Sequence, residues 1–400
     1  MPFDSTICFL NSNDGTGLLA FGEKSRFLPS KSQALDELQD YINQKLGAYL
    51  FGYLSYDLKN EVETLSSNNF DGLSFPTLFF WEPEYIIEIK QNKYTFIQGE
   101  QSLENTALIN EFLSSESKAK SNSFDFKFKE RTSKERYLEQ VISLKNSIQR
   151  GDIYEVNYCQ EYFAENVKIE YPIAVYNKLN SLTKAPFSSY FHFDNYSLFC
   201  GSPERYIKLN NKRLISEPIK GTAPRSKDPI QDLRNKENLE TDPKERAENI
   251  MIVDLVRNDF SKIAANHSVK VDALCAVHSF ENVHQMISTV SCEINEGTTF
   301  TDIIKASFPM GSMTGAPKLK AMELIEESED FKRGLYSGSL GYINPNGDFD
   351  FNVIIRSIFY DKNAKTLSFQ VGSAITLDAD PVKEYEECLL KAESILKALA

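Results

Sequence analysis

The chain has 400 residues, of which 41% are hydrophobic and 12% aromatic, so it can build a well-buried interior and is not expected to be disordered. Its 44 Lys and Arg against 57 Asp and Glu give a formal net charge of −13, which argues against nucleic acid or an anionic membrane as main partner. Its first residues carry no basic segment and no apolar run approaches the roughly 18 residues of a membrane span, so we expect a cytoplasmic protein.

The first third of the chain alternates strand-like runs with short helical patterns. Residues 50–58 and 77–90 are rich in aromatic and β-branched residues, which is typical of half-buried strands. Residues 114–123 are polar and have no hydrophobic period, so they are interpreted as a surface linker. This change in composition predicts a boundary between an N-terminal region, 1–123, and a C-terminal region, 124–400.

Strands and helices mix after the linker. Alternating phenylalanines over 124–128 predict a strand, and a capping pattern over 132–135 predicts a helix that ends at Gly151. Further strands are predicted over 195–209, 212–222 and 366–377, and further helices over 242–258, 317–328 and 381–399. Because the two types do not alternate regularly, the pattern favours an α+β fold with large antiparallel sheets over a doubly wound sheet.

Two of these helices begin alike, with Asp-Pro at 242–243 and at 380–381, an N-cap residue followed by proline at the first helical position. Each then carries two glutamates three residues apart, Glu245 and Glu248 in one helix and Glu384 and Glu387 in the other. The first pair shares a stripe with Ile252 and Leu255, so it is expected to be buried or to line a cleft. Converging carboxylates suit Mg²⁺, and a magnesium site therefore competes here with a plain solvated helix face.

Three further features point to binding or catalysis. Lys220 ends a β-rich stretch beside Gly221, where a desolvated lysine could have a lowered pKa and act as a nucleophile, although a lone lysine is usually a surface residue. Segment 311–318 leads into a helix whose first amides suit a carboxylate, with a plain loop-to-helix turn as the alternative. Arg356 lies in an apolar strand and needs an anionic partner, for which a carboxylate fits.

Other active-site types find little support. His278, Glu281 and His284 superficially suggest zinc, but a six-residue spacing puts the histidines about 240° apart on a helix, and His284 alone is more often a hydrogen-bonded core residue. The six cysteines form no C-x-x-C pair, so neither a zinc ribbon nor a small disulfide scaffold is expected. No G-x-S-x-G, cysteine elbow or G-x-G-x-x-G is present, which disfavours hydrolase and nucleotide-dependent functions.

Nine segments in a fixed order carry a stronger signal. They are G-D-I-Y-E-V-N (151–157), S-P-E-R (202–205), P-I-K-G-T (218–222), K-E-R-A-E-N-I-M-I-V-D-L-V-R-N-D (244–259), V-H-Q-M-I-S (283–288), T-G-A-P-K (314–318), G-Y-I (341–343), I-I-R-S (354–357) and E-Y-E-E-C-L-L-K (384–391). Together they resemble the chorismate-utilising enzymes, and within that family the component I subunits of aminodeoxychorismate synthase. The resemblance implies the fold of the family, two large antiparallel β-sheets packed as a sandwich with peripheral helices.

The resemblance also implies roles for individual residues. It implies a Mg²⁺ site in the cleft, with Glu248 and Glu387 as direct ligands and with Glu245 and Glu384 nearby. Lys220 would be the nucleophile, and Glu204 the general acid that assists departure of the C4 hydroxyl. The implied substrate-binding residues are Gly221, Thr222, His284, Thr314, Tyr342, Arg356, Gly372 and Lys391. By analogy, Tyr342 and Arg356 hold the enolpyruvyl carboxylate, while Thr222, Gly372 and Lys391 surround the ring and its carboxylate.

Single positions distinguish the branches of the family. Isochorismate and salicylate synthases carry a lysine that activates water where this chain has Glu155, which disfavours water addition. Anthranilate synthase component I typically has alanine where this chain has Lys220, the residue that in aminodeoxychorismate synthases attacks ring C2 as the C4 hydroxide leaves. Ammonia then adds at C4 and expels the lysine. The resemblance therefore implies Mg²⁺-dependent amination of chorismate at C4 to 4-amino-4-deoxychorismate, for 4-aminobenzoate and folate synthesis.

No glutaminase domain is evident in the sequence, so we expect ammonia to come from a separate glutamine amidotransferase subunit or from free ammonia. The nearest rival function is that of anthranilate synthase component I, against which Lys220 argues. A rival of another class is a catalytically silent subunit that binds chorismate or a partner without turnover. The presence of Lys220, Glu204 and all four glutamates argues against that second rival.

Overall fold

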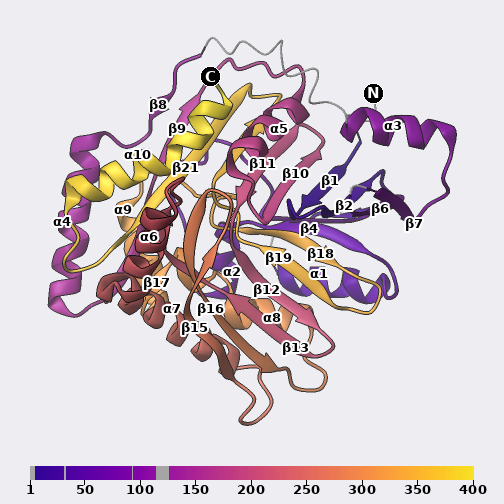
Figure 1. Ribbon diagram of the computed structural model, residues 1–400. Helices are drawn as coiled ribbons and strands as arrows, with labels where there is room; N and C mark the ends of the chain where they lie inside the picture. The colour runs from indigo at the N-terminus through magenta and orange to yellow at the C-terminus, as the bar shows by residue number, and fades with distance from the viewer. Residues whose placement is uncertain (1–4, 31–32, 92, 114–125) are drawn as a thin grey trace.

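Two large β-sheets pack against each other, and helices cover their outer sides (Figure 1). The structure is a computed structural model that describes residues 5–30, 33–91, 93–113 and 126–400. Each strand pairing within the two sheets is antiparallel, as between β9 (Glu155–Ala164) and β21 (Thr366–Ile375). The predicted fold class, α+β with two antiparallel sheets in a sandwich, is confirmed.

Each sheet combines strands from the N-terminal and the C-terminal parts of the chain. The first sheet runs β17 (Gly315–Ala316), β9, β21, β20 (Ser357–Asp361), β11 (Tyr196–Ser202), β10 (Phe187–Phe193), β1 (Ile7–Asn11), β2 (Thr16–Phe21), β6 (Tyr85–Lys90) and β7 (Lys93–Gln98), with β8 (Lys129–Glu130) beside β9. The second runs β14 (Ile219–Pro224), β16 (Val283–Glu293), β13 (Arg213–Glu217), β12 (Arg205–Asn210), β19 (Phe349–Asn352), β18 (Ser339–Ile343), β4 (Leu50–Leu54), β5 (Leu78–Glu82) and β3 (Ser25–Phe27), with β15 (Lys270–Ser279) beside β16. Early and late strands pair in both sheets, as β1 does with β10 and β4 with β18. The linker predicted over 114–123, and with it the predicted domain boundary, lies outside the described residues.

Alternation of side chains along the strands builds two apolar cores. On β10, Phe191 and Phe193 enter the core between the sheets, where both rings pack against Phe79. Tyr190 faces the other way and belongs to the core between the first sheet and its covering helices. Burying an aromatic or aliphatic side chain of this size contributes about 1.5–3 kcal/mol, so the two cores dominate the stability of the fold.

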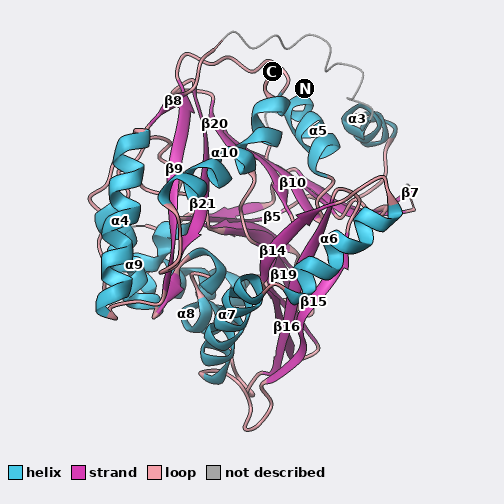
Figure 2. Cartoon of the chain, turned by 60° about the vertical axis from the view of Figure 1, so that its left-hand side comes forward, coloured by secondary structure: helices cyan, strands magenta, loops and turns pink. Residues whose placement is uncertain are grey.

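Helices close the two outer faces. Their bounds are α1 (Ala34–Gln44), α2 (Lys59–Val62), α3 (Leu103–Leu113), α4 (Lys134–Arg150), α5 (Pro172–Thr183), α6 (Pro229–Thr241), α7 (Pro243–Ser261), α8 (Phe300–Ser307), α9 (Lys318–Ser328) and α10 (Pro381–Ala398). Helix α10 packs on β21 and α4, while α6 and α7 pack on β14 and β16 (Figure 2). Throughout the described segments, none of these helices has the length and apolar character that a membrane crossing needs.

Most predicted elements are confirmed, with breaks where proline interrupts pairing. The helices predicted over 242–258, 317–328 and 381–399 are α7, α9 and α10. The strand predicted over 195–209 divides into β11 and β12 around Pro203, which cannot donate a backbone hydrogen bond to a neighbouring strand. That break places the next residue, Glu204, outside the regular sheet.

Two local predictions are wrong. Of the strand expected over 124–128, residues 124 and 125 lie outside the described residues, residues 126–128 are irregular, and β8 begins only at Lys129. The N-cap of α4 is Ser133 rather than Thr132, because the Ser133 hydroxyl accepts the backbone N–H of the third helical residue at 3.2 Å. The Thr132 hydroxyl instead donates to Asp330 Oδ2 at 2.9 Å.

Candidate active site

Lys220 lies in a buried group of carboxylates where the two sheets meet. It is the second residue of β14, where pairing with β16 is irregular between Ile219 and Thr222. Its Nζ donates to Oε1 of Glu155, the first residue of β9 in the other sheet, at 2.7 Å. The two side chains are only 10% and 0% exposed, so this ion pair is shielded from solvent.

The pKa of Lys220 is raised, whereas the sequence analysis expected it to be lowered. Burial alone would lower the pKa of its ammonium, but Glu155, Glu248 and Glu204 outweigh burial and raise the pKa. The lysine is therefore protonated in the free protein and must lose a proton before it can act as a nucleophile. Glu155 is positioned to accept that proton, since its Oε1 already accepts a hydrogen bond from the ammonium. Its Oε2 is buried without a hydrogen-bond partner in the described part of the chain.

Glu204 has the environment of a general acid. It is 4% exposed, and burial raises the pKa of its carboxyl to about 7 against the opposing effects of Ser312 and Lys220. Ser312 donates its hydroxyl to Oε1 of Glu204 at 2.6 Å, from a 3₁₀ turn over Gly311–Met313. Near neutral pH this carboxyl can therefore carry a proton and give it up.

The two glutamate pairs stand on matching helix starts. Asp242 and Asp380 each accept two backbone N–H groups of the following turn, which confirms the predicted N-caps of α7 and α10. Between the helices lies the Lys244 ammonium, with its Nζ 3.8 Å from Oε1 of Glu248 on α7 and 4.0 Å from Oε1 of Glu384 on α10. A cation thus already joins carboxylates of both helices.

These carboxylates fit a divalent cation by their chemistry. Burial raises the pKa of Glu245, Glu248 and Glu384, that of Glu248 to about 7. Burial would also raise the pKa of Glu387, but Lys391, 2.7 Å away, outweighs burial and lowers it. Oε1 of Glu248 is buried with no hydrogen-bond partner among the described residues, a costly state that a metal ion would relieve. In the described ranges, no three acidic, histidine or cysteine side chains already surround a single cation position.

Two glycines allow backbone segments to approach this site closely. Gly221 has φ +88°, and a Cβ there would lie 3.0 Å from Oε2 of Glu245, so β14 passes against α7 only because the residue is glycine. On β21, a Cβ at Gly372 would lie 2.5 Å from Sγ of Cys159. The carbonyl of Gly372 accepts a hydrogen bond from Lys391 Nζ at 2.8 Å, so these two predicted binding residues are in contact.

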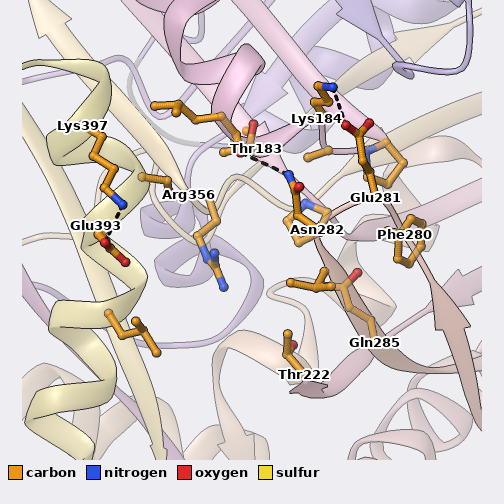
Figure 3. A pocket seen from close by; sticks show the side chains of 18 residues that line it. Thr183, Lys184, Thr222, Phe280, Glu281, Asn282, Gln285, Arg356, Glu393 and Lys397 are labelled. Carbon is orange, nitrogen blue, oxygen red and sulfur yellow. Dashed lines mark hydrogen bonds and ion pairs between the residues drawn. The ribbon is translucent and has the colours of Figure 1, made fainter. Parts of the chain in front are cut away.

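Figure 3 shows side chains that line a cavity of about 350 Å³. It lies next to the group of carboxylates, because Arg356 in its lining interacts electrostatically with Glu387. Pro203, which precedes Glu204, and Thr222, on the same strand as Lys220, both line it. Arg356 points into it, and burial lowers the pKa of its guanidinium, for which no described residue accepts a hydrogen bond. The φ of +53° at Arg356 is strained for a non-glycine residue. A half-buried guanidinium that points into a cavity and has no hydrogen-bond acceptor among the described residues suits a carboxylate ligand.

His284 does not face this cavity. Its Nδ1 is 2.9 Å from the Ser279 hydroxyl and its Nε2 is 3.1 Å from Oδ1 of Asp232, so both ring nitrogens have protein partners. The next residue on β16, Gln285, lines the cavity. Neighbouring side chains of a strand point to opposite faces, so Gln285 points towards the cavity where His284 points away from it. The sequence analysis named His284 as a binding residue and did not name Gln285. Because adjacent residues of a strand face opposite sides, only one of the two can line the cavity, and it is Gln285.

Tyr342 and Thr314 do not line the cavity into which Arg356 points. Tyr342 lines a second cavity of about 290 Å³, where its ring centroid is 5.8 Å from that of Phe51. The Thr314 hydroxyl is buried and donates to the carbonyl oxygen of Met310 at 3.3 Å. Contacts and charge interactions therefore join Lys220, Glu204, Gly221, Gly372, Lys391 and the four glutamates. Of the predicted site residues, Thr222 and Arg356 line the cavity, and His284, Thr314 and Tyr342 do not.

Comparisons with known proteins agree on one family. The family model for chorismate binding enzymes matches residues 8–397. Anthranilate synthase component 1 of Thermus thermophilus is 34% identical over 360 residues, 87% of this chain and 76% of that protein. Aminodeoxychorismate synthase component 1 of Klebsiella aerogenes is 38% identical over 267 residues, 67% of this chain and 58% of that protein. The crystal structure of anthranilate synthase component I from Streptococcus pneumoniae superposes with a TM-score of 0.80 at 25% identity, over 95% of this chain and 92% of that one.

Proposed function

The chain belongs to the chorismate binding enzyme family, and we propose that within it the chain aminates chorismate at C4 to give 4-amino-4-deoxychorismate. The observation that carries this proposal is Lys220, a buried amine paired with Glu155 beside the cavity into which Arg356 points. A lysine in that position can form a covalent adduct with the substrate ring and later leave it. The product would serve 4-aminobenzoate and folate synthesis.

The first half of the proposed reaction replaces the C4 hydroxyl. Lys220 passes its proton to Glu155, whose Oε1 already accepts the hydrogen bond at 2.7 Å. The freed amine forms a bond to ring C2, the ring double bond shifts, and the C4–O bond breaks. Glu204 gives its proton to the departing hydroxyl, which leaves as water.

The second half releases Lys220. Ammonia forms a bond to C4, the double bond shifts back, and the bond between C2 and the lysine nitrogen breaks. The new C4 ammonium returns a proton to Glu204, and Lys220 recovers its proton from Glu155. Glu204, Glu155 and Lys220 therefore end in the protonation states in which they began. Overall, chorismate and ammonia give aminodeoxychorismate and water.

Mg²⁺ is the cofactor that we propose for the carboxylates of α7 and α10, with Glu248 and Glu387 as ligands and Glu245 and Glu384 nearby. When bound, it would supply positive charge for a substrate carboxylate. Support comes from Oε1 of Glu248, which is buried and makes no hydrogen bond with a described residue, and from the ammonium of Lys244, which lies between the two helices 3.8 Å from that oxygen.

Production of anthranilate is the second candidate function. Anthranilate synthase component 1 of Thermus thermophilus matches 87% of this chain, whereas the same protein of Aquifex aeolicus and the aminodeoxychorismate synthase component 1 of Klebsiella aerogenes match about two thirds. Both groups carry the designation component 1, which supports our proposal of a separate glutamine amidotransferase subunit as the source of ammonia.

Product analysis tests the proposed function directly. We expect the purified chain, given chorismate, Mg²⁺ and ammonium, to form aminodeoxychorismate, detected by mass spectrometry with a coupled lyase. Turnover should rise with ammonium concentration at fixed pH, and glutamine should replace ammonium only after a glutaminase subunit is added. Anthranilate as main product would favour the second candidate, and no aminated product would favour a silent subunit. Glutamine-driven turnover by the chain alone would contradict a separate source of ammonia.

The rate of adduct formation on Lys220 is expected to fall as pH rises through about 7. Because burial raises the pKa of Glu204 to about 7, the carboxyl carries its proton below that pH and has lost it above. Single-turnover mixing of chorismate with enzyme and Mg²⁺, without ammonia, separates this step from the titration of ammonium. A Glu204→Gln variant should lose this falling limb and react roughly 10²- to 10⁴-fold more slowly. If the variant keeps the falling limb, another group titrates.

A further inference from the structure

Gln285 presents an unused amide to the cavity next to Lys220. It is 5% exposed, and its side chain makes no hydrogen bond with any described residue, unlike the neighbouring His284. Its backbone pairs with Thr222, so the two residues lie side by side on β16 and β14. Figure 3 shows both side chains and the Arg356 guanidinium around the same space. Because the amide opens onto the cavity and is not paired with any described residue, it is available to hydrogen-bond a ligand there.

We propose that Gln285 binds the same substrate carboxylate as Arg356, through hydrogen bonds from its side-chain amide. The inference rests on the proposed function, since it takes chorismate as the ligand and the enolpyruvyl carboxylate as the group at Arg356. Arg356 supplies the charge and Gln285 a neutral donor, while the two lysines that line the cavity, Lys184 and Lys397, are paired with Glu281 and Glu393. The position of Gln285 on the cavity face of β16 follows from His284, whose two ring nitrogens engage Asp232 and Ser279 on the other face.

Two substitutions separate a binding role from a structural one. Gln285→Leu keeps the bulk and removes the amide, and it should raise the Kd for chorismate roughly 10- to 100-fold, as for a lost hydrogen bond to a charged group. Gln285→Glu is nearly isosteric, but its carboxylate would pair with Arg356 and compete with the substrate. Binding by this variant should be weaker still at pH 8. Measured relative to the parent at the same pH, it should recover as pH falls and the new carboxyl is protonated, which a structural role would not produce.

The matched control is Gln231→Leu on α6, where an exposed glutamine donates to Asn235 at 2.8 Å. Its Kd for chorismate should equal that of the parent, measured by isothermal titration calorimetry with Mg²⁺ present. A second ligand, 4-hydroxybenzoate, has a ring carboxylate but no enolpyruvyl group, so Gln285→Leu should leave its Kd unchanged.

The outcomes distinguish the inference from the proposed function. If the parent binds and aminates chorismate and both Gln285 variants keep its Kd, the inference is wrong and the function stands. An equal loss for chorismate and 4-hydroxybenzoate would mean that the amide does not bind the enolpyruvyl carboxylate. If the parent itself binds no chorismate, the proposed function fails first. Should Gln285→Leu not fold, the pH dependence of Gln285→Glu decides the question alone.

Discussion

Replacing Lys220 with alanine is expected to reduce aminodeoxychorismate formation by about 10²- to 10⁴-fold, the usual range for loss of one positioned catalytic group. The variant should fold and still bind chorismate with Mg²⁺, because Glu204, Arg356 and the metal-site glutamates remain. Without the covalent adduct, ring C2 is open to ammonia. The residual amination should therefore shift towards the C2 product that leads to anthranilate. Chromatography coupled to mass spectrometry measures both products, and it should find a chorismate-derived adduct on Lys220 of the parent.

A Lys220→Arg variant separates nucleophilic attack from charge pairing. Arginine stays protonated at all accessible pH values, so it can still pair with Glu155 but cannot attack the ring. We expect it to bind chorismate better than the alanine variant and to aminate C4 no faster. Unchanged C4 amination in either variant, with no adduct on the parent lysine, would mean that Lys220 only binds the substrate.

Local sequence signals predicted much of the fold for identifiable reasons. The Asp-Pro starts of α7 and α10 act within one turn, so their caps could be predicted from neighbouring residues alone. Predicted strand boundaries were less accurate where a single proline interrupts the hydrogen bonding of a strand, as Pro203 does between β11 and β12. The interleaving of early and late strands depends on pairings between residues far apart, such as Ile7 with His192, which no local pattern contains.

The candidate site shows the same division. The glutamate pairs, Lys220 and Arg356 were predicted as chemically unusual residues. The partnership of Lys220 with Glu155 was not, because the two residues lie 65 positions apart on different sheets. That partnership reverses the expected direction of the Lys220 pKa, since burial was foreseeable and the opposing carboxylates were not. The choice of His284 over Gln285 depended on which face of β16 meets the cavity, which only the assembled sheet reveals.

Neutralising Glu248 is expected to have the second large effect. In a Glu248→Gln variant the side chain keeps its size, but one anionic ligand of the proposed Mg²⁺ site is lost. Its affinity for Mg²⁺ should fall by more than the 10- to 100-fold that is usual for groups that merely support a metal ligand. Because the metal would face a substrate carboxylate, chorismate binding should weaken with it. Calorimetric titration of chorismate at several Mg²⁺ concentrations measures both effects, and EDTA should abolish turnover of the parent until Mg²⁺ is restored.

The matched control is Asp254→Asn, which removes one negative charge from an exposed side chain of the same helix that pairs with Arg257. It should bind Mg²⁺ and chorismate as the parent does. Lys244 offers a second comparison, because its ammonium lies between Glu248 and Glu384, where it would compete with a metal ion. Lys244→Met should therefore keep or raise the Mg²⁺ affinity, whereas a lysine needed only to hold α7 to α10 would lower the melting temperature when replaced. Full activity of Glu248→Gln at low Mg²⁺ would contradict the assignment, since a metal ligand cannot lose its charge without loss of affinity.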